Sequence, residues 1–419
     1  MSVAALVGAM VVLSATPGVA APKPGTERVT LSSTGEQADG DAYGPQLSAD
    51  GRFAVFTAYA SNLVPGDTNQ SSDVFVRDLR KGTVERVSVR SDGGQADGTS
   101  SAQAISADGR YVLFRSNARN LVHWDNPPTT DSGDDIYLHD RRTGTTKRMS
   151  VALDGGTAYA ANATMSADAR YIAFNAKADR METDPADLFG AVYVLDRRTG
   201  AVERITNRDR PDNPALLQGL SADGRQVAYT QLVPRSSYGR TWVHDRSTGT
   251  EEQVNVRPDG SPAVRYAMPA SLSADGRTIA FDYWGDEELV PGETPDSSST
   301  VYVRDLSKDV TRRVKASAAG EDRLREPRIS PDGRYVTYHA NPRLPNGELG
   351  PANAYLRDLR TGSTRLLGTS ASGDPVTDGD VTVSAVGPDA RFVGLSSDSA
   401  QLVPGDTNGR SDGFVRRLR

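Results

Sequence analysis

The sequence predicts an all-β fold, a closed seven-bladed β-propeller of four-stranded antiparallel blades. A short turn motif recurs seven times, two aromatic positions recur with it, and the strand that the last copy lacks is found at the N-terminus. The motif reads Ser-Ala-Asp-Gly-Arg or a near copy, and its aspartates lie between 52 and 60 residues apart, at Asp50, Asp108, Asp168, Asp223, Asp275, Asp332 and Asp389. This period suits a propeller blade with long loops.

Each copy repeats one order of strands. In the first, apolar residues 53–56 follow the turn, and β-rich runs follow at residues 74–76 and 84–89. Short runs of this kind, bounded by Asp, Gly and Pro, are typical of strands. We expect the Asp-Gly step to take positive φ at both positions of a tight hairpin. The copies with Ala169 and Ala390 in place of Gly should be slightly strained.

A second turn motif predicts a second hairpin in each blade. It reads Asp-(Leu/Arg)-Arg-Thr-Gly, and glycine can supply the left-handed position that such a turn needs. Both hairpins would then lie at one end of the blades. The clearest copies end at Gly144, Gly200 and Gly362.

Two aromatic registers support the count of seven. A residue type that repeats in every blade is typical of packing between blades, and we expect these side chains to form the core. The second strand ends in Phe56, Phe114, Phe174, Tyr229, Phe281, Tyr338 and Leu395; the third carries Phe75, Tyr137, Tyr193, Trp242, Tyr302, Tyr355 and Phe414.

The ends of the chain predict how the ring closes. The seventh copy stops after its third strand, whereas residues 27–32, Glu-Arg-Val-Thr-Leu-Ser, match the fourth-strand text at residues 85–89 and 203–206. We therefore expect an N-terminal strand to complete the last blade. Closure removes the open edges that a linear array of sheets would expose.

The turn motif, the apolar strand ending in Phe and the Val-Tyr-Val-x-Asp strand together resemble the TolB-type propeller repeat of secreted and periplasmic bacterial proteins. The residues 330–335, Ser-Pro-Asp-Gly-Arg-Tyr, are the best match, and the resemblance covers roughly residues 27–419. It implies a fold rather than an activity, because the family includes protein-binding scaffolds and the propeller halves of serine peptidases. TolB has six blades and a separate α/β domain, for which this sequence has no room.

Composition and the N-terminus predict one exported domain. The content of 40 Gly and 24 Pro supplies turns, 37% hydrophobic residues can fill a core, and no linker interrupts the repeats, so residues 22–419 are expected to form a single propeller. Residues 1–21 resemble a secretory signal peptide, although no Lys or Arg precedes their apolar run. We expect a secreted or periplasmic protein. The chain has no cysteine, so no disulfide holds it together.

Charge excludes one class of partner. The net charge is -6, and acidic and basic residues alternate without a basic stripe, so we expect no nucleic-acid binding, no membrane span after cleavage, and a monomer.

Arg77, Arg304 and Arg357 follow the third-strand aromatic by two residues, each beside an aspartate. We expect them to be solvated charges on the outer strands.

The longer connections predict the binding surface. If both hairpins lie at one end of the ring, the variable loops lie at the other, for example residues 58–73, 116–135, 91–100 and 208–216. Variable loops on a rigid scaffold are a common place for recognition.

One loop phrase suggests a calcium site. Asp67, Asn69, Ser71 and Asp73 alternate as hard oxygen ligands do in calcium loops, and Asp406, Asn408 and Asp412 repeat most of the pattern in the last copy. Both segments contain Leu-Val-Pro-Gly-Asp-Thr-Asn. However, there is no glycine at the sixth position and no downstream Glu, and Asp, Asn and Ser also bond their own backbone in ordinary turns. Both interpretations stay open here.

Catalytic groups are sparse. The four histidines are His123, His139, His244 and His339, and none has a partner at zinc-ligand spacing. His139 and His244 occupy the repeat position of Arg77, so we expect a structural, outward-facing role. No Gly-x-Ser-x-Gly elbow is present. The leading hypothesis is a non-enzymatic scaffold for a protein or cell-envelope partner; the alternative is a metal-dependent hydrolase or polysaccharide lyase with acidic residues in the central channel.

Overall fold

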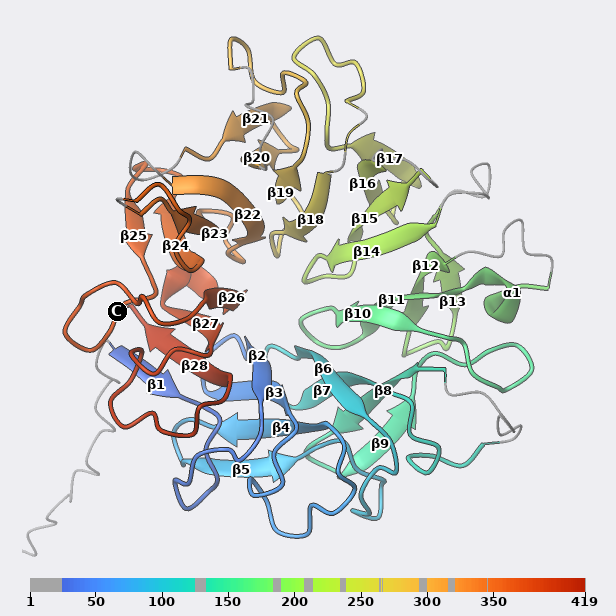
Figure 1. The fold of residues 1–419 in the computed structure, drawn as a ribbon. Coiled ribbons are helices and arrows are strands. Elements are labelled where there is room, and N and C mark those ends of the chain that lie inside the picture. Colours follow the sequence, from blue (N-terminus) through green and yellow to red (C-terminus); the bar gives the residue numbers. More distant parts are fainter. Residues whose placement is uncertain are drawn as a thin grey trace, which may run out of the picture.

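A computed structural model describes residues 25–124, 133–183, 190–206, 214–233, 239–263, 265, 267–293, 300–315, 321–344 and 346–418. The described residues form seven four-stranded antiparallel sheets arranged around a central axis (Figure 1). The prediction of a seven-bladed propeller is confirmed. The predicted signal peptide, residues 1–21, lies outside the described residues.

Each of the first six blades is a continuous run of four strands. Blade 1 has β2 (Ala42–Leu47), β3 (Phe53–Ala58), β4 (Asp73–Asp78) and β5 (Thr83–Arg86); blade 2 has β6 (Ser100–Ile105), β7 (Tyr111–Ser116), β8 (Asp135–Asp140) and β9 (Thr145–Arg148); blade 3 has β10 (Ala161–Met165), β11 (Tyr171–Lys177), β12 (Gly190–Asp196) and β13 (Val202–Arg204). Blade 4 has β14 (Ala215–Leu220), β15 (Gln226–Leu232), β16 (Gly239–Asp245) and β17 (Thr250–Gln253); blade 5 has β18 (Ala267–Leu272), β19 (Thr278–Tyr283), β20 (Thr300–Asp305) and β21 (Val310–Arg313); blade 6 has β22 (Glu321–Ile329), β23 (Tyr335–Pro342), β24 (Asn353–Asp358) and β25 (Thr364–Leu366).

The seventh blade joins the two ends of the chain. It contains β26 (Val381–Val386), β27 (Phe392–Ser397) and β28 (Asp412–Arg417), and its outer strand is β1 (Gly25–Arg28). β1 runs antiparallel to β28, with Arg28 opposite Phe414, and Figure 1 shows the blue strand beside the red ones. Closure by an N-terminal strand is therefore confirmed.

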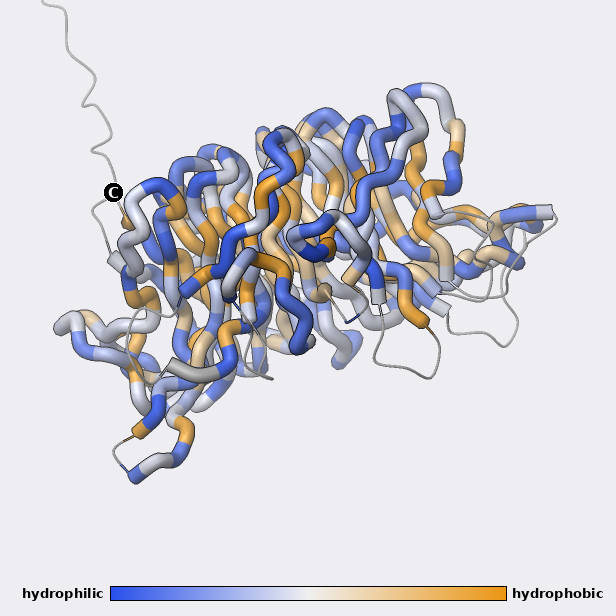
Figure 2. The backbone as a smooth tube through the Cα atoms, turned by 90° about the horizontal axis from the view of Figure 1, so that it is seen from above, coloured by the Kyte–Doolittle hydropathy of each residue, from blue (hydrophilic) through white to orange (hydrophobic). Residues whose placement is uncertain are grey.

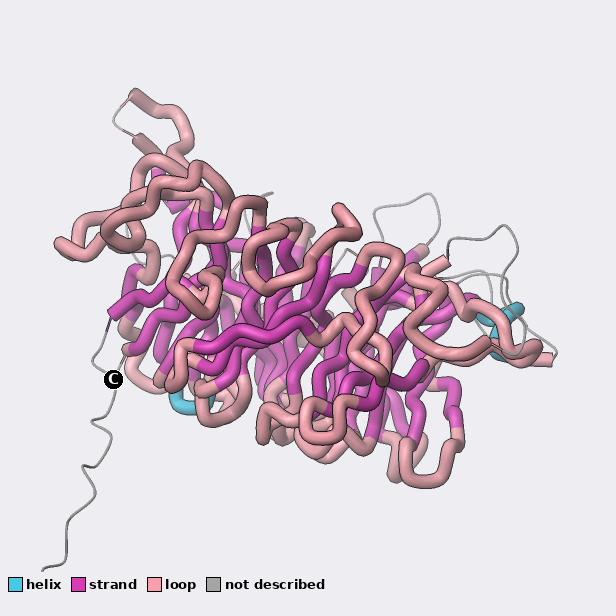
Figure 3. Tube along the Cα trace, turned by 90° about the horizontal axis from the view of Figure 1, so that it is seen from below, coloured by secondary structure: helices cyan, strands magenta, loops and turns pink. Residues whose placement is uncertain are grey.

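The two ends of the ring differ. The hairpins between the first and second strands and between the third and fourth strands, such as residues 48–52 and 79–82, lie at one end, which we call the turn face. The longer connections, such as residues 59–72 and 87–99, lie at the other, which we call the long-loop face (lower and upper edges of Figure 3). The short helix α1 (Ala178–Met181) follows β11 in a long connection, and the 3₁₀ turn η1 (Pro388–Ala390) belongs to the turn face.

The core lies between the two faces, within and between blades, where Figure 2 shows the hydrophobic residues concentrated along the strands. The two aromatic registers meet directly across the second and third strands: Phe56 is opposite Phe75, and their ring centroids lie 5.8 Å apart. The same positions pair across the second and third strands of the other blades, with Leu395 opposite Phe414 in blade 7, and these side chains are buried except for Trp242, which is half-buried. The prediction that they form the core is confirmed.

In the first six copies the repeated turn has a different conformation from the one predicted, whereas in the seventh both Asp389 (φ 52°) and Ala390 (φ 47°) have the predicted positive φ. Asp50 does not have a positive φ, and Gly51 alone takes the left-handed conformation, with φ of 65°. The Asp50 side chain instead accepts hydrogen bonds from Ser48 Oγ (2.8 Å) and the Arg52 N–H (3.0 Å), which fixes a longer turn than a two-residue hairpin. Alanine adopts the left-handed conformation in the third and seventh copies, at Ala169 (φ 56°) and Ala390 (φ 47°), so the predicted strain is present there.

The prediction of solvated arginines on the outer strands is wrong for Arg77 and Arg304, which are buried. Arg77 Nη1 donates to the carbonyl oxygens of Leu31 (2.8 Å) and Ser32 (3.2 Å), which follow the outer strand of the seventh blade. Long arginine stems can be buried when the guanidinium satisfies carbonyl groups. His139 shares this repeat position and is buried too, not outward-facing. The position therefore links neighbouring blades.

Candidate functional site

Exposed apolar side chains are distributed unevenly between the two faces. Among the described residues, the large hydrophobic side chains that are exposed lie mostly on the long-loop face or at the strand ends beside it. Those eight are Tyr43, Tyr59, Val151, Leu153, Val233, Trp284, Leu344 and Leu349, whereas the turn face has two, Val202 and Val310. Exposed apolar groups that gather on one side of a soluble protein are typical of an interaction surface.

A large hollow on this face lies beside Trp284, between blades 4, 5 and 6. It has a volume of about 670 Å³ and is lined by Leu232, Met268, Pro269, Asp282, Trp284, Arg325 and Glu326. Trp284 directly follows β19, and its side chain is 55% exposed. We call this cavity the Trp284 hollow. An exposed indole beside aliphatic side chains gives a partner a rigid surface to bury.

The charged wall of the Trp284 hollow is ionised at neutral pH. Glu326 Oε2 lies 3.4 Å from His339 Nδ1, and this hydrogen bond holds the pKa of Glu326 below its usual value. His339 is buried, and its Nε2 accepts the Val383 N–H at 2.7 Å, which leaves the ring proton on Nδ1. Glu326 therefore offers an acceptor for hydrogen bonds or for a cation, not a proton for acid catalysis.

Arg325 lies on the same wall as Glu326. Its Nη2 donates to Asn341 Oδ1 at 3.2 Å, which orients the guanidinium. The Trp284 hollow thus combines an aromatic surface with one arginine and two acidic side chains, Asp282 and Glu326. This combination suits a mixed apolar and polar segment, such as part of a protein surface.

The predicted calcium ligands of blade 1 come together around an arginine. Arg86 Nη1 lies 3.4 Å from Asp67 Oδ1 and 3.5 Å from Asp73 Oδ2. Asn69 Nδ2 donates to Asp73 Oδ2 at 3.2 Å, and the Ser71 N–H donates to Asn69 Oδ1 at 3.0 Å. Burial raises the pKa of Asp67, so a positive partner is needed.

The last blade repeats this arrangement. Arg28 Nη2 lies 2.6 Å from Asp406 Oδ2, its Nε lies 3.5 Å from Asp412 Oδ2, and Asn408 Nδ2 donates to Asp412 Oδ2 at 3.0 Å. In both blades the guanidinium occupies the space between the carboxylates that the calcium hypothesis assigned to the metal. Calcium binding itself stays a prediction.

The described residues contain no group of three or more His, Asp and Glu side chains placed to hold a metal ion. His123 is exposed, His139 and His339 are buried in strands of blades 2 and 6, and His244 lies in β16 with Nδ1 3.7 Å from Glu251. Within the same described ranges, no helix is long and apolar enough to cross a membrane.

No family model and no curated protein matches this chain. Solved propellers match at low identity. Oligogalacturonate lyase from Vibrio parahaemolyticus is 13% identical with a TM-score of 0.56, over 94% of this chain and 93% of the lyase. The propeller domain of the trilobed protease from Pyrococcus furiosus is 12% identical with a TM-score of 0.55, over 91% and 94%. A putative TolB from Agrobacterium tumefaciens is 16% identical with a TM-score of 0.42, over 83% and 98%.

These likenesses show the fold alone. The chain is a seven-bladed propeller with distant structural similarity to the lyase and to the protease propeller, and a shared fold does not fix a function. The protease propeller is described as an open velcro, whereas β1 closes the ring here. Trp284, Arg325 and Glu326 were not predicted as site residues from the sequence. One feature of the sequence could have pointed to this site. Residues 321–328 are rich in charged side chains, whereas the corresponding strand of the other copies contains none.

Proposed function

We propose that this chain is an exported, non-enzymatic binding propeller, related to the TolB-type repeat proteins, that recognises a protein or cell-envelope partner through its long-loop face. One observation carries the proposal: eight of the ten exposed large hydrophobic side chains of the described residues lie at this face. Burial of apolar area is the main favourable term in protein association. A surface without a partner would gain nothing by exposing them.

The Trp284 hollow supports the proposal and gives the partner a point of attachment. Binding energy usually concentrates in a few aromatic and arginine side chains near the centre of an interface. Trp284 and Arg325 are of these types and line one hollow. We therefore expect a partner that inserts an apolar side chain beside Trp284 and contributes polar groups to Arg325 and Glu326.

The enzyme alternative has less support. It requires acidic residues in the central channel. At the turn face the channel holds a cavity of about 350 Å³, and none of the described residues that line this cavity is Asp, Glu or His. A hydrolase or lyase of this kind needs a metal or an acid and base pair at the reacting bond. The described side chains supply neither there.

The experiment compares one substitution on each face. Trp284→Ala removes an exposed side chain and should preserve the melting temperature. It should also lower, by about tenfold or more, the affinity for a partner captured from the envelope or secreted fraction. Val310→Ala is the matched control on the turn face and should bind as the unaltered chain does. Equal binding by all three proteins would refute the assignment of the long-loop face.

A further inference from the structure

The innermost strands around the channel are uncharged except in one blade. The text of β2, β6, β10, β14, β18 and β26 contains no Asp, Glu, Lys or Arg, whereas β22 reads Glu-Asp-Arg-Leu-Arg-Glu-Pro-Arg-Ile. Of the charged side chains on β22, Arg323, Glu326 and Arg328 are exposed and Arg325 is half-buried, so they contribute little to the packed core. The charge on β22 therefore calls for an explanation beyond folding.

β22 also departs from regular backbone geometry. Its register with β23 shifts twice, whereas the first strand of each other blade shifts once, and Arg323 and Glu326 have positive φ values of 55° and 52°. Bulges and left-handed non-glycine residues cost free energy, and they often aim a side chain at a functional site. The second shift lies between Arg325 and Arg328. Arg325 reaches the Trp284 hollow, whereas Arg328 lines a cavity at the turn face.

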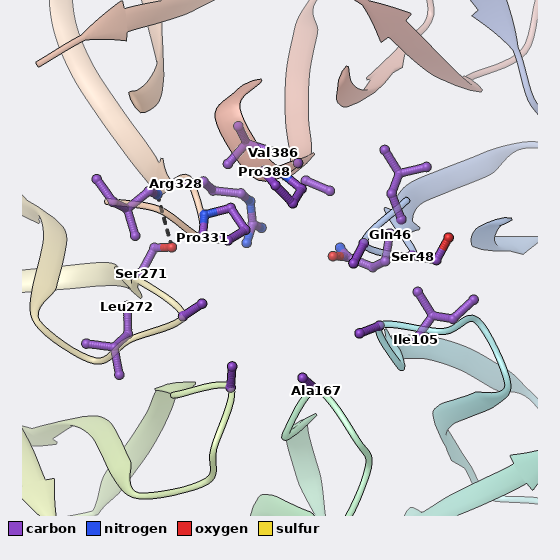
Figure 4. A pocket seen from close by; sticks show the side chains of 18 of the residues that line it. Gln46, Ser48, Ile105, Ala167, Ser271, Leu272, Arg328, Pro331, Val386 and Pro388 are labelled. Atoms are coloured by element: carbon purple, nitrogen blue, oxygen red, sulfur yellow. Dashed lines mark hydrogen bonds between the residues drawn. The ribbon is translucent and has the colours of Figure 1, made fainter. Parts of the chain in front are cut away.

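That cavity occupies the central channel and has a volume of about 350 Å³. Figure 4 shows Arg328 and Gln46 pointing into it from opposite sides. Arg328 Nε donates to the Val383 carbonyl at 3.2 Å, which fixes the side chain and directs the rest of the guanidinium away from the sheet. Gln46 Nε2 donates to the Ser384 carbonyl at 3.0 Å, so its Oε1 is directed elsewhere. We call this cavity the channel cavity.

The electrostatics of the channel cavity favour an anion. Arg328 is the only charged residue among the described residues that line it. The Arg328 side chain is exposed to the open channel; desolvation by the surrounding strands lowers the pKa of Arg328, and the charge of Glu326 opposes this. An arginine keeps its charge even so, and a positive charge in a narrow protein channel attracts negative ligands.

The remainder of the wall is suited to the body of a small molecule. Apolar side chains line it on several sides, among them Leu47, Ile105, Met165, Leu220 and Leu272. Small residues form the rim. The N–H of Ala49 donates to the carbonyl of Ala107 in the next blade (3.0 Å), and the equivalent backbone hydrogen bond joins each following pair of blades as far as Pro331 of blade 6. This rim keeps the entrance open and rigid.

We propose that the channel cavity binds a small organic anion, with its carboxylate or phosphate group paired to Arg328 and its apolar body against the inner strands. A planar guanidinium can bind either group through two parallel hydrogen bonds. The site lies on the turn face and is independent of the partner surface proposed above.

The test is calorimetric titration of the full chain with three probes that share one ring: benzoate, phenyl phosphate and benzyl alcohol. We expect at least one of the two anions to bind and benzyl alcohol not to bind. Benzoate alone would identify a carboxylate ligand, and phenyl phosphate alone a phosphate ligand. Arg328→Gln should weaken binding by about tenfold or more. Failure of both anions to bind, or equal binding of benzyl alcohol, would overturn the proposal.

Two further variants separate the site from general damage. Arg325→Gln, on the same strand but in the Trp284 hollow, should leave anion binding unchanged. Gln46→Glu keeps Arg328 and places a carboxylate across the cavity, so it should also abolish anion binding. Anion binding that survives in both Arg328→Gln and Gln46→Glu would show that the anion binds elsewhere.

Discussion

Arg28 and Asp406 form a buried ion pair across the junction of the two ends of the chain, with Nη2 2.6 Å from Oδ2. Arg28 is the last residue of β1, and Asp406 lies in the loop before β28. Asp412, which is fully buried, shares the same guanidinium. The pair therefore adds a charged contact to the backbone hydrogen bonds that close the ring.

Arg28→Gln should destabilise the protein by about 3–5 kcal/mol, because removing one partner leaves buried carboxylates without a counter-charge. Arg86→Gln is the matched control, since Arg86 makes the same contacts within blade 1. Chemical denaturation measures both costs. Hydrogen exchange separates them: amides of β1 and β28 should exchange faster in Arg28→Gln alone. Equal exchange in the two variants would show that the pair has no special part in closure.

Removal of residues 22–33 should lower the melting temperature sharply, because it deletes the outer strand of the seventh blade and exposes the edge of β28. A synthetic peptide of residues 22–33, added to the truncated chain, should restore part of the loss by refilling the edge. An unchanged melting temperature after truncation would contradict the role of β1.

Asp135 should make stability depend on pH. Burial raises the pKa of this carboxyl to about 7, although Arg148 Nη1, 3.6 Å from Oδ2, opposes the rise. Among the described residues Oδ2 has no hydrogen-bond partner, while Oδ1 accepts from Ser150 Oγ and the Ala158 N–H. The unfolded chain loses this proton near pH 3.9. Between about pH 4 and 7 the folded state therefore holds a proton that the unfolded state lacks, and stability falls as pH rises.

Asp135→Asn should remove this slope and stabilise the protein at pH 8 by on the order of 2–4 kcal/mol, with little change at pH 4. Asp73→Asn is the control at the same position of blade 1. It should destabilise at both pH values, because Asp73 Oδ2 accepts hydrogen bonds from Asn69 Nδ2 (3.2 Å) and Gln95 Nε2 (3.2 Å), whereas among the described residues Asp135 Oδ2 accepts none. Urea denaturation at the two pH values measures the difference. Asp135→Asn that is less stable than the unaltered chain at pH 8 would contradict the assigned pKa.

Calcium should produce neither heat in a calorimeter nor a rise in melting temperature. The carboxylates of Asp67 and Asp406 already have arginine partners, and a metal would have to displace a buried guanidinium. A stoichiometric binding heat that is lost in Asp67→Asn would restore the calcium hypothesis for blade 1.

The sequence was sufficient for the architecture because the repeats encode it. The turn motif marks each blade, and residues 27–32 carry fourth-strand text ahead of the first complete blade, which predicts closure. The burial of Arg77 could not be predicted, since its acceptors, Leu31 and Ser32, come from a neighbouring blade. The arginine partners could have been noticed, because Arg28 and Arg86 occupy the same place in the Glu-Arg-Val text of the two blades that share the loop phrase.

The Trp284 hollow was beyond sequence reasoning. Its lining comes from β15, β18, β19, β22 and the loop after β19, and only the folded ring brings these segments together. One tryptophan in a loop segment of the sequence does not indicate a binding site, because isolated hydrophobic residues are normal on protein surfaces. The concentration of such residues on one face became visible only when the strand directions were known.

The most direct test of the proposed binding face is photo-crosslinking from each face of the ring. A benzophenone side chain is placed at Tyr59 or Leu349 on the long-loop face, and at Val202 or Val310 on the turn face, and each protein is irradiated in the envelope and secreted fractions. If the long-loop face is the binding surface, we expect one discrete adduct from the long-loop positions and none from the turn positions. An adduct from the turn face alone, or from neither face, would contradict this assignment.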